Sequence, residues 1–201
     1  MNYLAHLSLS NNDPATMMGN FIADDISHRE LKELPSNIMK GVELHRLIDN
    51  YTDDHPAFRS SVEVFRSNHG KYATVIVDII NDHFLTLNWQ SFIQTPFDSF
   101  EGKVYSSFEM LNGQVPPSAN RHVTALLDHR YLKVYQTKEG MKGVMKRMDK
   151  RTRFKSDFLS TVDEAYDQIK ILNHNFVELY TDLQRELTSM WLSLSPDQPS
   201  K

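Results

Sequence analysis

Two pairs of polar side chains, each pair four residues apart, are the features of this sequence that could do chemistry. His45 and Asp49 lie in the run GVELHRLIDNYTD (41–53), and Asp78 and Asp82 lie in a Gly- and Pro-free segment (71–95). Residues four apart on a helix are separated by about 40°, so each pair shares a face. Apolar residues occupy the same faces, and a buried polar group must be paired, hydrogen-bonded or bound to a metal. The spacing fits a metal or catalytic site and equally a buried His–Asp pair that only fastens helices together.

The Asp78–Asp82 pair is the more informative of the two. Two carboxylates on an apolar face repel each other unless a proton or a cation lies between them, and a divalent metal would resolve this repulsion. His83 lies about 100° around the helix from Asp82. It is therefore placed either for catalysis or for a hydrogen bond to a neighbouring helix.

Three further residues complete the candidate set. Asp24 and His6 lie beside apolar neighbours in short segments and could close a pocket with the two helices, although a helix cap and a core histidine are their ordinary roles. Arg46 could hold a phosphate through its planar guanidinium group, although its helical position also fits an exposed residue. Imidazole and carboxylate ligands with open positions suit a Mn²⁺, Fe²⁺ or Mg²⁺ hydrolase.

The elements that must position these residues are predicted to be helices. Apolar residues recur at helical spacing in most segments, and no alternating run is long enough for a sheet. The segment 71–95 is apolar around nearly its whole circumference, so we expect it to be the most buried helix. Residues 158–192 predict one long helix or two in line. The sequence thus predicts a single compact all-α domain over residues 1–195, with a frayed C-terminal tail over 196–201.

Composition excludes several classes of protein. The 201 residues include no cysteine, which rules out disulfides and thiolate chemistry, and the net charge of −4 gives no general case for nucleic-acid binding. No apolar run is long enough for a membrane span, and the N-terminus lacks the features of a secretion signal, so we expect a cytoplasmic protein without a membrane partner. One segment, KGVMKRMDKRTRFK (142–155), carries seven basic residues and one acid. It is either a solvated helix face or a dock for an acidic partner.

Four blocks of the sequence together resemble a known family. MNYLAHL (1–7), GNFIADD (19–25), ELHRLIDNYTDDHP (43–56) and DIINDHFLTLNW (78–89) occur in the order and at the separations found in the bacterial acyl carrier protein phosphodiesterases, and RMDKRTRF (147–154) is a weaker fifth block. The resemblance implies hydrolysis of the phosphodiester that joins 4′-phosphopantetheine to a serine of holo acyl carrier protein, a reaction of fatty acid metabolism. It also implies a divalent cation, with Mn²⁺ favoured, and an all-α fold related to the HD-domain phosphohydrolases. An HD-type His–Asp dipeptide is missing here, because only Asp82–His83 occurs, in the reverse order.

The residue patterns and the resemblance together give the expected site. The positions that match the family are His6, Asn20, Asp24, His45, Arg46, Asp49, Asp53, Asp78, Asp82 and His83. We expect metal ligands among Asp24, His45, Asp49, Asp78 and Asp82, and catalytic residues among Asp24, His45, Arg46, Asp78 and His83. We expect the acidic carrier protein to contact Lys142, Lys146, Arg147, Lys150, Arg151 and Arg153. Two alternatives stay open: a metal phosphohydrolase acting on a nucleotide or another small phosphate ester, and a helical interaction protein without enzymatic activity.

Overall fold

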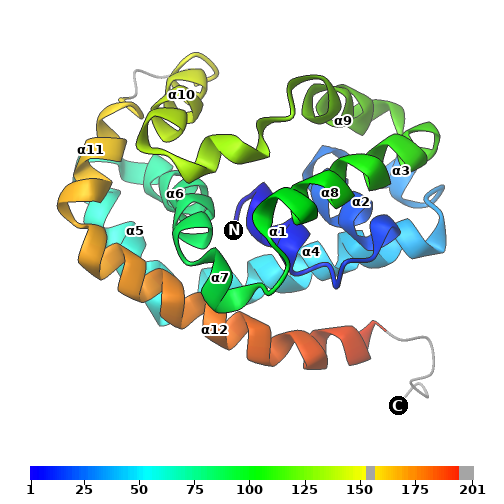
Figure 1. Cartoon of the computed structure of the whole chain (residues 1–201), viewed down its shortest axis with the longest axis horizontal. Coiled ribbons are helices and arrows are strands. Elements are labelled where there is room, and N and C mark those ends of the chain that lie inside the picture. The colour runs from blue at the N-terminus through cyan, green and yellow to red at the C-terminus, as the bar shows by residue number, and fades with distance from the viewer. Residues whose placement is uncertain (153–156, 195–201) are drawn as a thin grey trace.

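The computed structural model describes residues 1–152 and 157–194, and this part of the chain is built from helices alone (Figure 1). The prediction of an all-α fold is confirmed. None of the described helices is both long and apolar enough to span a bilayer. The predicted tail 196–201 and Arg153 lie outside the described residues, so the predicted domain limits stay a prediction. The α-helices are α1 (Tyr3–Ser8), α2 (Pro14–Ile22), α3 (His28–Leu31), α4 (Ser36–Asp54), α5 (Pro56–His69), α6 (Ala73–Leu87), α7 (Trp89–Phe92), α8 (Phe97–Leu111), α9 (Pro117–His129), α10 (Lys138–Asp149), α11 (Ser160–Asp167) and α12 (Ile169–Ser193), and the 3-10 helices are η1 (Ala23–Asp25), η2 (Gly70–Tyr72), η3 (Asn112–Gln114) and η4 (Tyr131–Gln136).

Helices α2 and α4 approach each other unusually closely because a glycine on each faces the other. A Cβ atom added to Gly19 would lie 1.9 Å from the Ile38 carbonyl oxygen, and one added to Gly41 would lie 2.3 Å from the Thr16 carbonyl oxygen. Both obstacles are backbone atoms, which cannot rotate away as the end of a side chain could. The contact therefore fixes α2 directly against α4.

Helix α6 is largely buried, as the sequence predicts, and packs against α1, α5, η4 and α12. It is shorter than the predicted segment because the chain breaks at Asn88, whose side-chain amide donates to the Phe84 carbonyl at 2.8 Å. The burial is also less uniform than expected, since Val75 is exposed. Helix α6 carries Asp78, Asp82 and His83 and so fixes where these residues lie.

The C-terminal segment forms two consecutive helices, as one of the two predicted arrangements has it, but the chain turns between them instead of continuing in line (Figure 1). Helix α11 ends at Asp167 and α12 begins at Ile169, and α12 runs along the lower edge of the molecule in Figure 1. Another boundary falls at Arg130, which adopts a left-handed conformation (φ 42°) and ends α9 before η4. The chain then turns into η4 and α10, whose basic residues lie near the site described next.

Candidate active site

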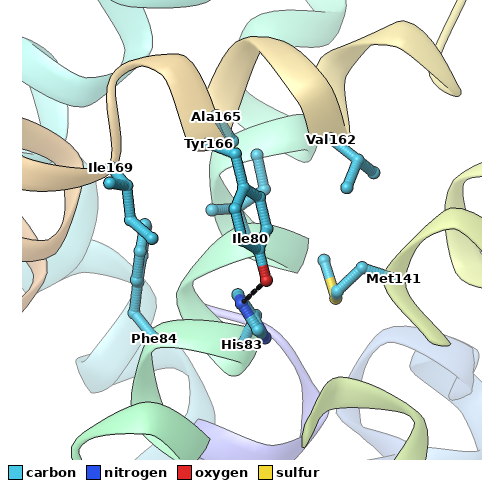
Figure 2. A pocket seen from close by; sticks show the side chains of 8 residues that line it. All are labelled: Ile80, His83, Phe84, Met141, Val162, Ala165, Tyr166 and Ile169. Atoms are coloured by element: carbon cyan, nitrogen blue, oxygen red, sulfur yellow. Dashed lines mark hydrogen bonds between the residues drawn. The ribbon is translucent and has the colours of Figure 1, made fainter. Parts of the chain in front are cut away.

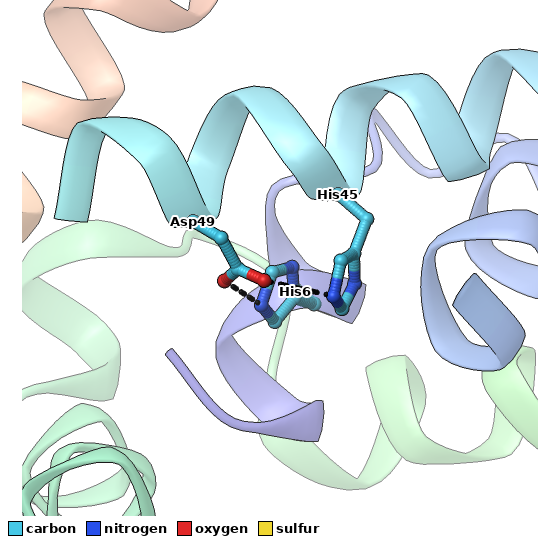
Figure 3. A group of neighbouring side chains, drawn as sticks. All are labelled: His6, His45 and Asp49. Carbon is cyan, nitrogen blue, oxygen red and sulfur yellow. Dashed lines mark hydrogen bonds and ion pairs between the residues drawn. The ribbon is translucent and has the colours of Figure 1, made fainter. Parts of the chain in front are cut away.

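The centre of the candidate site is a cluster of three side chains from two helices. His6 comes from α1, and His45 and Asp49 come from α4 (Figure 3). The two imidazole rings stack with centroids 4.1 Å apart. Asp49 contacts both rings, with Oδ1 3.1 Å from His6 Nε2 and Oδ2 2.9 Å from His45 Nε2. One ligand atom from each residue lies within 4.8 Å of the others, so the cluster could hold a metal ion.

Asn20 on α2 determines how the His45 ring is oriented. The Nδ1–H of His45 donates to the Asn20 carbonyl oxygen at 2.8 Å, which leaves Nε2 facing Asp49 and, at 3.3 Å, Asp24. The Asn20 side chain donates to the His6 carbonyl at 2.9 Å and so ties α1 to α2. Gly19 lets α2 pack directly against α4, and this close backbone contact places the next residue, Asn20, against His45.

Asp82 on α6 fixes the helix that carries His6. Its carboxylate accepts from the backbone N–H groups of Leu4 (2.9 Å) and Ala5 (3.0 Å), at the start of α1. The preceding residue Asn2 supplies no side-chain cap, so Asp82 satisfies these donors in its place. Burial raises the pKa of Asp82 to about 7, although the two backbone hydrogen bonds oppose this rise.

The pKa values of the two stacked histidines are shifted in opposite directions. Burial lowers the pKa of His6 to about 4, and the hydrogen bond with Asp49 offsets only part of this effect. Burial alone would also lower the pKa of His45, but hydrogen bonds with Asp24 and Asp49 outweigh it and raise the pKa to about 9. Burial would raise the pKa of Asp49, yet the hydrogen bonds with both histidines hold it well below its usual range. At neutral pH the cluster thus contains a neutral His6, which has a lone pair to offer a cation.

A cleft of about 330 Å³ opens beside the cluster. His6, His45, Asp24 and Asp78 are among the residues that line it. Asp78 is half-buried, which raises its pKa, while the Met1 amino group 2.9 Å from its Oδ1 opposes the rise. The lining also includes residues from the N-terminal segment and α6, and from α9, η4 and the region at the end of α10: Met1, Asn2, Tyr3, Val75, Ile79, His122, Ala125, Tyr131, Tyr135, Val144, Arg147, Met148 and Arg151.

The structure thus brings together four of the predicted site residues: Asp24, His45, Asp49 and Asp78. Three others lie elsewhere. Asp82 uses both oxygens on the α1 backbone, and Arg46 is exposed on α4 and does not line the cleft. Asp78 and Asp82 thus have separate partners, the Met1 amino group and the α1 backbone, and whether they also share an ion stays a prediction.

His83 also lies apart from the cluster. Of its two predicted roles, the structure shows the hydrogen bond to a neighbouring helix. Its Nδ1–H donates to the Tyr135 carbonyl at 2.6 Å, and its Nε2 accepts from the Tyr166 hydroxyl at 2.9 Å. Both ring nitrogens are therefore occupied. Figure 2 shows the ring among apolar side chains from α6, α10, α11 and α12, around a cavity of only about 10 Å³. This space holds at most about one water molecule.

Some site residues were not predicted from spacing. His6 has no carboxylate one turn away on α1, so no i, i+4 pair marked it, and only its apolar neighbours and the match to the family block pointed to it. Asn20 carries no charge and its contribution depends on the α2–α4 contact. His122, whose Nδ1 lies 2.7 Å from Asp25 Oδ2, gave no signal at all.

The basic residues on and after α10 do not form one uniform patch. Lys142 lies 3.3 Å from Asp163, which also pairs with Lys138, so its charge is partly neutralised. Lys146 and Lys150 are exposed. Arg147 and Arg151 instead line the cleft, and Arg153 lies outside the described residues.

Comparison with known proteins identifies the family. Residues 1–183 match the family described as acyl carrier protein phosphodiesterase. Proteins named acyl carrier protein phosphodiesterase from Enterobacter sp. (strain 638) and from Salmonella agona (strain SL483) are each 28% identical over 174 residues, which cover 85% of this chain and 90% of theirs. No solved structure matches the chain, so the kinship with HD-domain phosphohydrolases stays a prediction. The resemblance that the four sequence blocks indicated is confirmed, and the match extends over residues 1–183. The chain belongs to the acyl carrier protein phosphodiesterase family.

Proposed function

We propose that this protein hydrolyses the phosphodiester between 4′-phosphopantetheine and the serine of holo acyl carrier protein. The products are apo carrier protein and 4′-phosphopantetheine. Family membership supports the substrate, and one structural observation supports the chemistry: imidazole and carboxylate side chains that could hold a metal lie at a cleft that is also lined by two arginines.

The His6–His45–Asp49 cluster fits a divalent metal, with Mn²⁺ as the first choice and Mg²⁺ or Fe²⁺ as alternatives. Two imidazoles and a carboxylate are donors of the kind that Mn²⁺ and Fe²⁺ accept. His6 Nδ1 is buried without a hydrogen-bond partner among the described residues, and such an atom is costly unless something binds there. Asp24 lies beside His45, and Asp78 lines the same cleft; both could complete the ligand set. A bound metal would supply a Lewis acid for the phosphoryl group and would activate water.

The protein residues have separate tasks in this reaction. Asn20 holds the His45 ring through Nδ1, and Asp82 holds the helix that presents His6. Asp24 has a lowered pKa, chiefly because of its hydrogen bond with His45, and is therefore ionised at neutral pH. It lies at the cleft, where a carboxylate can accept a proton from the attacking water. The water oxygen adds to phosphorus, the bond to the serine oxygen breaks, and the serine regains its hydroxyl proton from water.

The carrier protein would approach over the exposed lysines at the end of α10 and directly after it. Lys146 and Lys150 have exposed side chains, and an acidic partner would be steered by their charge. This contribution acts on the association rate and weakens as ionic strength rises.

The proposed function is tested by incubating the protein with holo acyl carrier protein and Mn²⁺ and following the mass of the carrier. We expect the carrier to lose one phosphopantetheine, and we expect a chelator to prevent the loss. An Asp49→Asn variant should be inactive, whereas Arg46→Gln, which changes an exposed residue of the same helix, should keep its activity. An unchanged carrier mass, together with turnover of small phosphodiesters, would replace this proposal with the small-ester alternative.

A further inference from the structure

Arg147 and Arg151 line the cleft, whereas the neighbouring Lys146 and Lys150 of the same basic segment do not. Arg147 and Met148 lie three and four residues after Val144 on α10, Arg151 follows three residues after Met148, just past the end of the helix, and all four line the cleft. Such a spacing places residues on one face of a helix. Lys146 lies about 160° from Val144 around the same helix and does not line the cleft. The basic segment therefore presents arginine inward and lysine outward.

The guanidinium groups of these arginines are not used to hold the fold. Neither forms a hydrogen bond or an ion pair with another side chain in the part of the chain that the structure describes. The charge of Arg151 reaches two phenols of the cleft. Burial raises the pKa of Tyr3 to about 12, and the positive charge of Arg151 opposes the rise, as it does for Tyr131. Arg151 thus lies near these two tyrosines of the cleft, although much of its side chain is accessible to solvent.

The carboxylates of the cleft require a positive counterpart if an anion is to enter. Asp24 and Asp78 both line the cleft and would repel a phosphodiester anion. The planar guanidinium group matches two phosphate oxygens at once, which a lysine ammonium cannot do. Arg46, the arginine that the sequence suggested for this task, lies outside the cleft.

We infer that Arg147 and Arg151 bind the phosphodiester group of the substrate in the cleft that His6 and His45 also line. This inference rests on the proposed function for the identity of the diester, but it concerns phosphate recognition rather than recognition of the carrier surface. The two roles differ in what a small substrate experiences. A phosphate-binding arginine acts on every phosphodiester, whereas a residue of the docking surface acts only on the carrier protein.

The test compares Arg151→Gln and Arg147→Gln with the matched variant Lys146→Gln on two substrates. One substrate is holo acyl carrier protein, and the other is bis(p-nitrophenyl) phosphate, which has no carrier. Loss of one charge-assisted hydrogen bond should lower kcat/KM about ten- to a hundredfold. We expect this loss on both substrates for the arginine variants. Lys146→Gln should affect the carrier alone, and Arg151→Lys should recover only part of the activity because it cannot bind bidentately.

Two results would overturn the inference. If Arg151→Gln and Arg147→Gln keep wild-type kcat/KM on both substrates, the arginines do not bind the phosphate. If they lose activity on the carrier alone, they belong to the docking surface.

The inference also has a test that does not need turnover of the carrier. The ³¹P resonance of inorganic phosphate should broaden when the phosphate binds to wild-type protein in the presence of Mn²⁺. With Arg151→Gln, about tenfold more phosphate should be needed to reach half-saturation of this binding. A wild-type protein that leaves holo carrier unchanged but binds phosphate through Arg151 would refute the proposed function and keep the inference. Equal phosphate binding by the two proteins would refute the inference alone.

Discussion

Substitution of Gly41 by alanine tests whether the close contact between α2 and α4 positions the site. The new Cβ would lie 2.3 Å from the Thr16 carbonyl oxygen and 2.8 Å from the Asn20 nitrogen. Ordinary contact begins near 3.4 Å, so the two helices would have to separate by about 1 Å. Because the obstacles are backbone atoms, no side-chain rotation can relieve the clash.

The expected loss of stability follows from two opposing effects. Overpacking costs about 3 kcal/mol at the upper end of its range, while replacing glycine in a helix gains about 1 kcal/mol. The free energy of unfolding should therefore fall by about 2 kcal/mol, and the melting temperature by about 4–8 °C. Gly102 on α8 is the matched control, since a Cβ there meets nothing within 4 Å. Gly102→Ala should raise the melting temperature by about 2–4 °C.

Urea unfolding of the three proteins provides the measurement, with a constant m value as the sign that the unfolded states are alike. Activity should be measured at a temperature where every protein is folded. Gly41→Ala should lose activity there, because a shift of α2 moves Asn20 away from His45, whereas Gly102→Ala should not. A Gly41→Ala variant as stable and as active as the wild type would refute the argument that this contact positions the site.

Three further predictions concern individual side chains. Asn20→Ala should weaken Mn²⁺ binding about tenfold, because the His6 carbonyl loses its side-chain donor on α2 and His45 Nδ1 loses its second acceptor, Asn20 Oδ1 at 3.2 Å, while the backbone carbonyl of residue 20 still accepts from His45; electron paramagnetic resonance of free Mn²⁺ measures this, and unchanged affinity would contradict it. Asp82→Asn should lower the free energy of unfolding by about 1–3 kcal/mol, because one buried backbone donor of α1 loses its acceptor. The purified variant should still bind Mn²⁺ in the same molar ratio as the wild type. Loss of the metal without loss of stability would make Asp82 a ligand. Burial lowers the pKa of His83, so the unfolded state binds more protons below about pH 6.5, and stability is lost as the pH falls through this range. His83→Gln should therefore lose less stability than the wild type between about pH 7 and about pH 5 in urea unfolding, and parallel losses would count against a neutral buried His83.

The sequence predicted what depends on local pattern. The helical spacing of His45 and Asp49 placed both on one face, and their helix delivers them together to the cluster. The same argument applied to Asp78 and Asp82 predicted a shared face but could not predict the partners. Asp78 lies beside the Met1 amino group and Asp82 caps α1, and both contacts join segments more than seventy residues apart.

Other features of the site depend on contacts between distant segments that a single sequence does not display. The pairing of Gly19 with α4 brings Asn20 to His45, and only the packed helices reveal that these glycines face each other. The basic segment was recognised by its charge alone. Its division into cleft-lining arginines and an outward lysine follows from the way α10 lies over the cleft.

The proposed attack of water on phosphorus can be tested by hydrolysis of holo acyl carrier protein in ¹⁸O-labelled water, in the presence of Mn²⁺ and with the masses of both products measured. We expect ¹⁸O in the phosphate of the released 4′-phosphopantetheine and an unlabelled carrier with an intact serine, because water attacks phosphorus and the bond to the serine oxygen breaks. A carrier that retains its prosthetic group, that carries the label, or that has lost its serine oxygen by elimination would contradict this mechanism.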